Sequence, residues 1–332
     1  MSTRFRIATF NVENLDDKPG ELPSLDTRIA VLRPQLLRLQ ADILCLQEIH
    51  GQETPGQPRQ LLALRKLLEN TPYSTYHVAS TMTADGKQVY DERNLVILSR
   101  FEIIAAEQYK HQFVPPPAYR LITANPPETQ AADMTWERPI LHARIRLGDT
   151  TTLHLINIHL KSKLPTDIRG QKIDNYTWRS ISGWAEGFFV SSLKRVGQAL
   201  EVRRVIDTLF DEDPAALIAV GGDFNADLDD VPLEAIRGDV ENTGNAALGL
   251  RNMVPCERTI PEPARFSLIH QGRGNMLDHL LISRSLLAFY RSSEIHNEVL
   301  HDESAAFADD RKFPESDHAP FIAEFELPDM FH

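Results

Sequence analysis

The sequence predicts a mixed α/β fold built around a layered β core, and two observations support this prediction. First, several predicted strands are apolar on both faces, as expected where one sheet packs on another. Second, helical patterns separate some of these strands along the chain. The predicted strands cover residues 5–11, 43–47, 95–99, 141–147, 152–160, 217–221, 280–283 and 320–327.

Three helices are expected from apolar residues spaced three or four positions apart. Asp26 or Thr27 could cap the first helix, and Pro34 should kink or restart it. The apolar positions are Ile29, Leu32, Leu36 and Leu39 in the first helix, Leu61, Leu64, Leu67 and Leu68 in the second, and Leu193, Val196, Leu200 and Leu209 in the third.

Two stretches, near residues 112–136 and 164–190, fit no regular element well and are predicted to be long loop insertions. The first contains two proline runs, at 115–117 and 126–127. The second is polar with scattered aromatic residues, and it follows His159 closely in the chain. We expect it to form a lid or substrate wall, or alternatively a surface hairpin whose aromatic side chains pack on the core.

The chain length and composition favour one large domain over two small ones. The chain has 332 residues and 42% hydrophobic content, which is enough for a sizeable core. The candidate site residues run from residue 9 to residue 318, so any central boundary would divide the site between two halves. We therefore expect residues 1–332 to form a single domain without a linker.

The formal net charge is −12, which argues against broad electrostatic capture of long polyanions. The segment from Lys161 to Arg204 differs, because it contains nine Lys or Arg and four Asp or Glu, a local charge of +5. It begins beside His159 and would attract a phosphate group. The other interpretation is a solvated helix face with ordinary surface charge.

The two cysteines provide neither a disulfide framework nor a thiolate metal site, and Cys45 lies in an apolar run typical of a buried thiol. The N-terminus enters a strand pattern without an apolar leader, and no run of about 18 apolar residues occurs. We therefore expect a cytoplasmic protein without a membrane span.

Five short polar patches, each at the end of a predicted strand or directly after one, are the main functional signal. Strand ends on one side of a layered core meet at one rim, so the patches could build a single site. The patches are Thr9-Phe10-Asn11, Gln47-Glu48, Asn157-Ile158-His159, Gly222-Asp223-Phe224-Asn225 and Ser316-Asp317-His318.

These patches contain mostly oxygen donors, the ligand type that hard cations prefer, so Mg²⁺ is the first expectation and Mn²⁺ the second. A zinc site remains open, although the His-Glu-x-x-His spacing and a cysteine cluster are both missing from the sequence. The candidate oxygen donors are Asn11, Glu48, Asp223, Asn225 and Asp317.

The residue types also suggest catalytic roles. Asp223 at a strand end could orient or deprotonate a water, and Asn225 could donate its amide to a phosphoryl oxygen. Strand alternation puts His159 on the same face as Asn157, which makes it a ligand candidate. Asp278, placed before an apolar strand, could orient a catalytic histidine such as His318.

Together these motifs resemble the metal-dependent endonuclease/exonuclease/phosphatase superfamily, in the family's order and over nearly the whole chain. The resemblance rests on Thr9 to Asn14, Leu46-Gln47-Glu48, Asn94 to Arg100, Asn157 to Lys163, Gly222 to Asn225, Leu277-Asp278-His279 and Ser316 to Pro320.

The resemblance implies a four-layer α/β/β/α sandwich with two packed, mainly antiparallel sheets. It also implies that Asn11, Glu48 and Asp317 hold a divalent metal. Asp223 and Asn225 would hold the attacking water, His159 would bind the scissile phosphate, and Asp278 would orient His318. Whether the general base is Asp223 or His318 stays open.

The expected function is hydrolysis of phosphoester bonds, most simply by a phosphodiesterase acting on nucleic acid or a nucleotide. A phosphomonoesterase, a lipid or sugar-phosphate phosphodiesterase and a catalytically inactive binding module are the alternatives. Lys161, Lys163 and Asn94 are predicted substrate contacts, with strand-end solvation as an equal alternative for the two lysines. The sequence indicates no protein partner.

Overall fold

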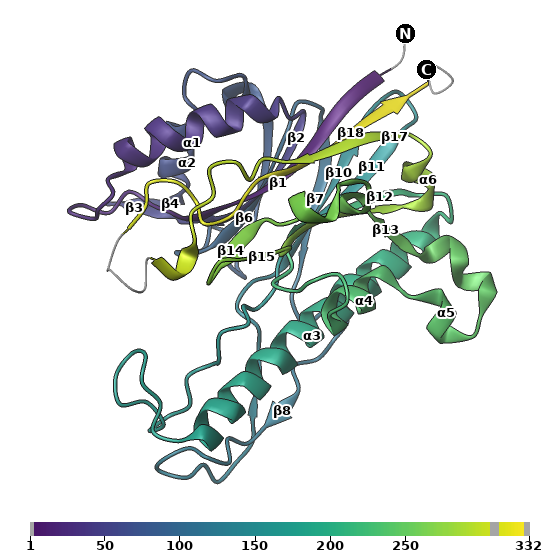
Figure 1. Cartoon of the computed structure of the whole chain (residues 1–332). Coiled ribbons are helices and arrows are strands. Elements are labelled where there is room, and N and C mark those ends of the chain that lie inside the picture. Colours follow the sequence, from purple (N-terminus) through teal and green to yellow (C-terminus); the bar gives the residue numbers. More distant parts are fainter. Residues whose placement is uncertain (1–2, 306–311, 329–332) are drawn as a thin grey trace.

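The computed structural model describes residues 3–305 and 312–328, and two large sheets form its centre (Figure 1). The first sheet has the strand order β17-β18-β1-β2-β6-β5. Only its β1–β2 pair is parallel, and the other neighbours are antiparallel. Its strands are β1 (Thr3–Leu15), β2 (Ile43–Ile49), β5 (His77–Ser80), β6 (Asn94–Ser99), β17 (Tyr290–Ile295) and β18 (Phe321–Leu327).

The second sheet has the order β13-β16-β12-β11-β10-β7. Its β11–β12 pair is parallel and the remaining pairs are antiparallel. Its strands are β7 (Ile103–Tyr109), β10 (Ile140–Arg146), β11 (Thr152–His159), β12 (Leu217–Asp223), β13 (Met253–Pro255) and β16 (Asp278–Ser283).

The main core lies between the two sheets, and strand alternation decides which side chains enter it. In β1, Phe5 and Ile7 belong to the core between the sheets, whereas Ala8 and Phe10 belong to a second core on the outer face. Both faces of the central strands are therefore buried, which explains their nearly continuous apolar sequence.

Helices cover the outer face of each sheet. Helices α1 (Leu25–Leu39) and α2 (Leu62–Leu68) pack on the first sheet, and α3 (Ile181–Glu212) and α4 (Val231–Arg237) pack on the second. Figure 1 shows the two helical layers on opposite sides of the strands. The predicted four-layer α/β/β/α sandwich is confirmed.

All eight predicted strands are present, with ends displaced by a few residues. The sequence did not predict the outer strands β5, β7, β13 and β17. Few residues of β5, β7 and β17 are buried, and β13 has only three residues, so none of them gives a long apolar pattern. The remaining elements are α5 (Val240–Thr243), α6 (Arg284–Leu287), the hairpins β3 (Gln52–Thr54) with β4 (Gln57–Gln60) and β14 (Leu268–His270) with β15 (Arg273–Asn275), and four short 3-10 turns, Pro72–Thr75, Ala246–Arg251, Cys256–Thr259 and Glu262–Ala264.

The first helix differs from its prediction at two points. Its N-cap is Ser24, whose hydroxyl accepts a hydrogen bond from the amide of Thr27, so Asp26 and Thr27 lie inside the first turn. The helix also continues through Pro34 without restarting. Pro34 and Ala30 are both exposed, so water can satisfy the Ala30 carbonyl that lacks a proline N–H donor.

The two predicted loop insertions are only partly irregular. The first contains a short antiparallel pair, β8 (Ala118–Tyr119) with β9 (Ala132–Asp133). The second is helical from Ile181 onward, where Ser180 caps α3 by accepting a hydrogen bond from the Gly183 amide at 2.9 Å. Outward aromatic residues and two glycines obscured the helical period there. Figure 1 shows both segments extending beyond the sheets with the N-terminal half of α3.

The aromatic side chains of the second segment divide into two groups: Trp178 is partly buried against the small cluster of Ala124, Ile168 and Val190, whereas the others are exposed. The exposed fractions are 45% for Trp184, 43% for Phe188 and 47% for Phe189. The expectation that the aromatic side chains pack inward therefore holds for Trp178 alone. Separately, no helix within residues 3–305 and 312–328 is long and apolar enough to cross a membrane.

Candidate active site

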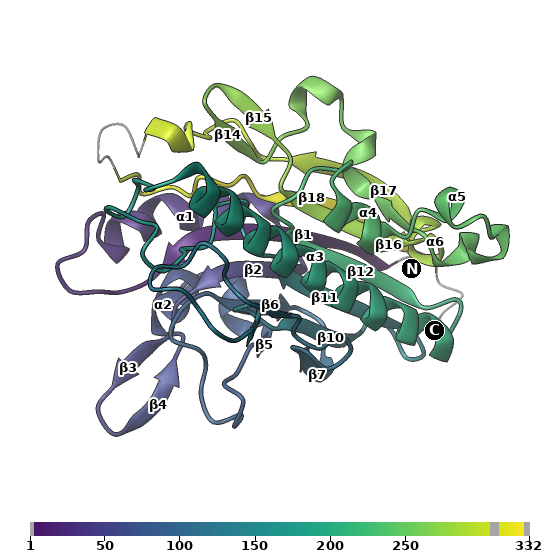
Figure 2. The same ribbon diagram turned by 90° about the horizontal axis from the view of Figure 1, so that it is seen from below.

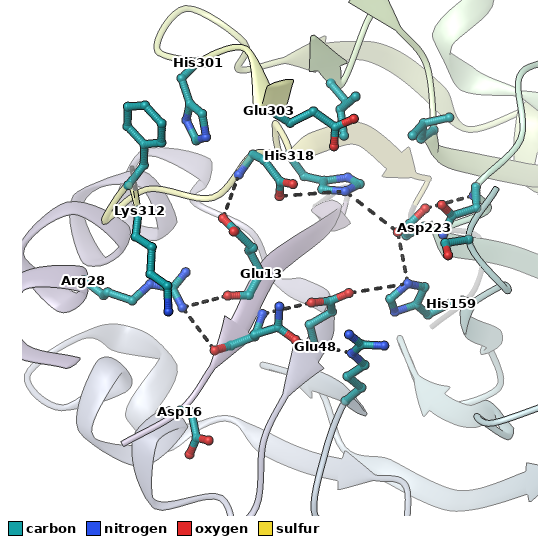
Figure 3. A pocket seen from close by; sticks show the side chains of 18 of the residues that line it. Glu13, Asp16, Arg28, Glu48, His159, Asp223, His301, Glu303, Lys312 and His318 are labelled. Atoms are coloured by element: carbon teal, nitrogen blue, oxygen red, sulfur yellow. Dashed lines mark hydrogen bonds and ion pairs between the residues drawn. The ribbon is translucent and has the colours of Figure 1, made fainter. Parts of the chain in front are cut away.

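A cavity of about 800 Å³ opens where the polar ends of strands from both sheets meet. Figure 3 shows side chains from several elements converging on it. Glu13, Glu48, Asp223, Asp317 and His318 all line this cavity, although they are far apart in the sequence. Four of the five polar patches thus contribute residues to the cavity lining, and the first patch, Thr9-Phe10-Asn11, does not.

Strand register in the second sheet places three functional side chains at one level. His159 in β11 pairs with Asp223 in β12, which pairs in turn with Asp278 in β16. Paired residues project to the same face of a sheet, so these side chains lie side by side. His159 Nε2 is 3.2 Å from Asp223 Oδ2.

Residues from the first sheet lie beside this row, and of Asn11, Gln47 and Glu48 only Glu48 lines the cavity. Asn11 in β1 donates a hydrogen bond from Nδ2 to Asp223 Oδ2 at 3.1 Å, which connects the two sheets. Glu48 lies at the end of β2 with a left-handed φ of 61°, and its Oε1 is 3.7 Å from His159 Nε2. Below them, Gln47 Nε2 donates to Asn157 Oδ1 at 2.8 Å.

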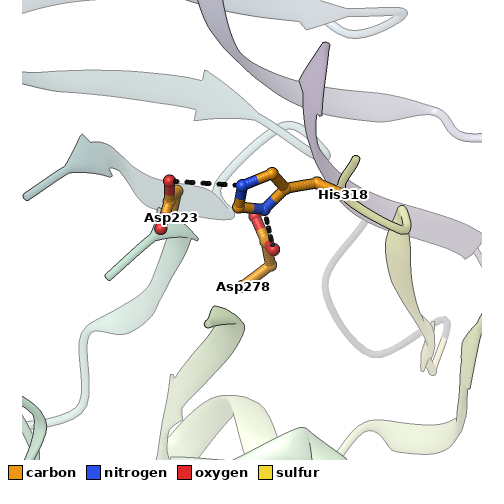
Figure 4. Close-up of side chains that lie close together, drawn as sticks. All are labelled: Asp223, Asp278 and His318. Carbon is orange, nitrogen blue, oxygen red and sulfur yellow. Dashed lines mark hydrogen bonds and ion pairs between the residues drawn. The ribbon is translucent and has the colours of Figure 1, made fainter. Parts of the chain in front are cut away.

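The Asp278–His318 pair that was predicted from the sequence is present (Figure 4). His318 Nδ1 lies 2.6 Å from Asp278 Oδ2, and Asp278 is fully buried. Burial alone would lower the pKa of His318, but Asp278 and Asp223 outweigh it and raise that pKa well above its ordinary value. The other ring nitrogen, Nε2, is 3.9 Å from Asp223 Oδ2 and faces the cavity side.

Asp223 is the most strongly perturbed carboxyl of this row. Its Oδ1 accepts a hydrogen bond from the amide of Asn225 at 2.9 Å. Burial raises the pKa of Asp223 to about 7, with Asp278 and Glu48 also raising it and His318 opposing the shift. Burial likewise holds the pKa of His159 well below its ordinary value, helped by the nearby Arg138. A group with a pKa near 7 is suited to accept and release a proton at neutral pH.

Three carboxylates crowd the opposite wall of the cavity. The Asp317 amide donates to Glu13 Oε2 at 3.2 Å, and burial together with Asp317 raises the pKa of Glu13 to about 8. Burial and then Glu48 raise the pKa of Asp317, although His318 opposes this. Asp317 Oδ1 is buried and finds no hydrogen-bond partner within the described residues.

This donor set fits a divalent cation. Buried carboxylates that repel one another are costly unless a positive charge compensates them. Asp317 Oδ1 forms no hydrogen bond within the described residues, and His318 Nε2 lies 4.0 Å from it, so this oxygen can still serve as a ligand. Asp223, Asp278 and His318 also lie close enough to hold an ion. Within that group His318 and Asp278 already satisfy each other at 2.6 Å.

Arginine side chains at the cavity were not predicted from the sequence. Arg138 is only 9% exposed, and its Nε has no partner in the part of the chain that the structure describes. Burial lowers its pKa, while Glu48 and Asp223 oppose this shift. Arg93 also lines the cavity. Both precede a strand as isolated cations, a position without a distinctive sequence pattern.

Glu13 is another cavity residue to which the sequence gave no role. It lies within β1, where Glu13 and Asn14 both have left-handed φ values near 50°. Ordinary strand alternation fails at such a bulge, so periodicity could not have placed the Glu13 side chain. Its position within the first motif was the only available signal.

Three predicted substrate contacts are less well supported by their surroundings. Lys163 lines the cavity but is paired with Asp227 and Asp230 at 3.1 and 2.9 Å. Lys161 does not contribute to the cavity lining, and its ammonium group donates to Ser162 Oγ. Asn225 lines the cavity, although its side-chain amide donates to the Leu160 carbonyl at 3.1 Å.

The structure corrects the assignment of Asn94 to substrate binding. Asn94 is fully buried, and its Nδ2 donates to the carbonyl oxygens of Ile49 and Tyr90 at 2.9 and 2.8 Å. Its Oδ1 accepts from the Tyr90 amide and from the Thr81 hydroxyl. The side chain therefore fixes the start of β6 and has no free group to offer a ligand.

The structure of this chain is similar to solved structures of other proteins. The chain matches solved structures of endonuclease/exonuclease/phosphatase family proteins from Bacteroides thetaiotaomicron (14% identity, TM-score 0.60, 100% of this chain and 98% of that chain) and Bacteroides vulgatus (18%, 0.57, 98% and 100%). A truncated Caenorhabditis elegans TDP2 is similar to the same degree (16%, 0.57, 97% of both chains). At these identities the likeness concerns the fold.

No curated protein matches the chain in sequence. The family model described as Endonuclease/Exonuclease/phosphatase family, however, matches residues 8–318. This match spans nearly the whole chain and includes the site residues from Asn11 to His318. The chain therefore belongs to the endonuclease/exonuclease/phosphatase family.

Proposed function

We propose that this protein is a divalent-metal-dependent phosphodiesterase that acts on nucleic acid or a nucleotide. The observation that carries the proposal is the row His159, Asp223, Asp278 and His318 beside the Asp317 carboxylate, whose Oδ1 forms no hydrogen bond within the described residues and lies 4.0 Å from His318 Nε2. The family generally hydrolyses phosphoesters with divalent metals, which agrees with this arrangement.

Glu48, Asp317 and Asn11 are the residues that would hold the metal, with Mg²⁺ expected and Mn²⁺ as the alternative. When bound, such an ion polarises a phosphoryl oxygen and lowers the pKa of a coordinated water. The Asp317 Oδ1 atom, which forms no hydrogen bond within the described residues, and the carboxylates that raise one another's pKa support this position. Oxygen-only donors favour a hard cation over zinc.

The chain's own groups would position the reacting atoms. Asp223 would orient the attacking water and accept its proton, for which its pKa of about 7 is suited. His318, kept protonated by Asp278, would donate Nε2–H to a phosphoryl oxygen that gains negative charge. His318 as the base is the competing assignment. His159 would contact the scissile phosphate beside Asp223.

Arg138 adds a charge that suits a phosphate substrate. Arg138 lines the cavity and is nearly buried, its Nη1 donates to the Leu160 carbonyl at 3.4 Å, and its Nε has no hydrogen-bond partner within the described residues. A small shift of this side chain would let the guanidinium donate to a phosphate oxygen. Together with Arg93 it would offset the carboxylates and orient the ester bond.

The proposal is tested by comparing plasmid DNA, single-stranded oligonucleotides, RNA, nucleotides and small phosphate esters in the presence of Mg²⁺. Asp223→Asn and His318→Ala should each reduce kcat by orders of magnitude while the protein stays folded. Asp85→Asn and His77→Ala, at exposed positions on other parts of the surface, are the matched controls. If only small phosphate monoesters are hydrolysed, the protein is a phosphomonoesterase and the proposed nucleic-acid or nucleotide substrate is wrong. Metal binding without any turnover would indicate a catalytically inactive binding module.

The site also bears on domain organisation. Its residues come from both sheets and from positions 11 to 318, so neither sheet alone carries the proposed chemistry. This supports treating the chain as one domain. Limited proteolysis should yield no fragment that keeps metal-dependent hydrolysis.

A further inference from the structure

The outer face of α3 carries an apolar stripe that no other element covers. Figure 2 shows α3 crossing the front of the molecule, with its outer face turned to the viewer. The stripe consists of residues exposed to the following extents: Ile181 85%, Trp184 45%, Phe188 43%, Val196 37% and Leu200 47%. Soluble proteins rarely expose so many large apolar side chains in one row, and such patches mark interaction sites.

Charge is missing from this face. All of α3 is described, and its other exposed residues between 181 and 200 are Ser182, Ala185 and Phe189, so none of them is ionisable. Of the cations in this stretch, Arg195 is buried and donates to the Lys161 carbonyl, and Lys194 is paired with Glu137 at 3.0 Å. A nucleic acid would find no phosphate contacts here, and anionic lipid would find no cations.

The order of side chains along the stripe is self-complementary. Trp184, Phe188, Val196 and Leu200 are spaced four or eight residues apart, and Ser192 occupies the central position. Each four-residue step turns about 40° beyond a full turn, so the stripe winds around α3. In two antiparallel copies that cross at about 50° on a two-fold axis at Ser192, Phe188 meets Val196 and Trp184 lies toward Leu200. Each large aromatic residue then faces a smaller aliphatic one, and the small Ser192 allows close approach at the axis.

The area reaches the lower limit of a specific dimer interface, which is about 600 Å² per partner. From their exposed fractions, the stripe residues and Phe189 offer roughly 600 Å² of apolar side-chain surface per copy, against about 800 Å² per partner in a standard interface. The flanking Ser182 and Ala185 would add to this area. From these observations we infer that α3 is the interface of a symmetric homodimer, in which the stripes of two copies pack antiparallel about Ser192.

The first experiment measures mass in solution by sedimentation equilibrium and light scattering. The wild type should dimerise in the micromolar range and associate more strongly at higher salt, because two chains of charge −12 repel less when screened. Val196→Glu should raise the dimer dissociation constant by more than about tenfold, since each dimer would bury two carboxylates against Phe188.

Val78→Glu is the matched control, because Val78 is 57% exposed on β5 in the other sheet. It should leave the dimer unchanged, and thermal melting would confirm that both variants fold. A wild type that stays monomeric at about 100 μM, or a dimer that Val196→Glu does not weaken, overturns the inference. Monomers that instead bind phosphatidylcholine vesicles would assign the stripe to a lipid surface.

Cysteine cross-linking tests the register. The native Cys45 and Cys256 are buried and free, so they should not interfere. Ser192→Cys should form a covalent dimer on mild oxidation, because the two introduced thiols meet at the axis. Ser182→Cys should not, since ten residues of helix place each copy about 15 Å from the axis and the two thiols about 30 Å apart. Linking at 182 but not at 192 would refute the proposed packing.

Discussion

Asp278→Asn should reduce turnover while leaving substrate affinity almost unchanged. Asp278 is fully buried, does not line the cavity, and contacts His318 at 2.6 Å. It is therefore a positioning residue, which holds the His318 ring and stabilises its charged form. A hydrogen bond to a charged group contributes about 1.5–3 kcal/mol. If that amount is lost from the transition state, kcat should fall about 10- to 150-fold, with little change in KM.

The chain provides a matched control for this experiment. His279 Nδ1 contacts Glu257 Oε1 at 2.5 Å, and both side chains are fully buried but outside the cavity lining. Glu257→Gln removes an equally buried carboxylate from a histidine next to Asp278 in sequence. It should cost stability to a similar degree, measured by urea denaturation, and leave kcat near the wild-type value.

Steady-state kinetics on the best substrate of the phosphoester panel would decide the question. If folded Asp278→Asn keeps the wild-type kcat, His318 needs no carboxylate partner and the reasoning fails. If Glu257→Gln loses as much kcat as Asp278→Asn, the loss reflects damage to the second sheet and not the chemistry of His318.

Three further predictions concern the metal, pH and backbone. Mg²⁺ at about 100 times its dissociation constant should stabilise the protein by about 2.7 kcal/mol, and Asp317→Asn should abolish this gain in thermal melts with and without EDTA. Burial and then His154 lower the pKa of His142 from 6.5 to about 4, so the unfolded chain binds a proton there that the native chain does not. Stability should therefore fall by up to about 3 kcal/mol between pH 6.5 and pH 4, and an unchanged pH slope of urea midpoints in His142→Phe would contradict this. Gly222→Ala should destabilise by more than about 2 kcal/mol, because the new Cβ would lie 2.0 Å from the Ile158 carbonyl oxygen at a φ of 150°. Gly86→Ala, with open space around the Cβ position, should cost clearly less in the same denaturation assay.

The sequence predicted those parts of the fold whose apolar pattern is unbroken. β12 was found because Leu217 to Val220 is an apolar run that ends in glycine, and its position made Asp223 a candidate. β7 was not found, because its side chains are exposed or only partly buried, as on many edge strands. The N-terminal turns of α3 were assigned to a loop, because their apolar residues face outward instead of toward the core.

The candidate site was predicted only as far as strand ends and motifs could reveal it. Asp278 and His318 were paired correctly. Asp278 begins β16 and His318 shortly precedes β18, so both could be placed from the apolar strands that follow them. Arg138 could not be found, because its importance comes from burial beside Glu48 and Asp223, which only the tertiary structure brings close. For Asn94 the prediction of a substrate contact was wrong. Its place in a motif did not reveal that its side-chain amide already donates to the carbonyl oxygens of Ile49 and Tyr90.

The division of the cavity between the two sheets makes catalysis sensitive to how the sheets are spaced. Asn11 and Glu48 belong to one sheet, whereas His159 and Asp223 belong to the other, and the Gln47–Asn157 hydrogen bond spans the gap below them. A side chain in the interior therefore acts as a spacer for the reacting groups, far from any ligand. Replacing such a core side chain by a smaller one would let the two sheets shift relative to each other. We expect kcat to fall before the melting temperature changes clearly, so kcat should respond to core packing more sensitively than thermal stability does.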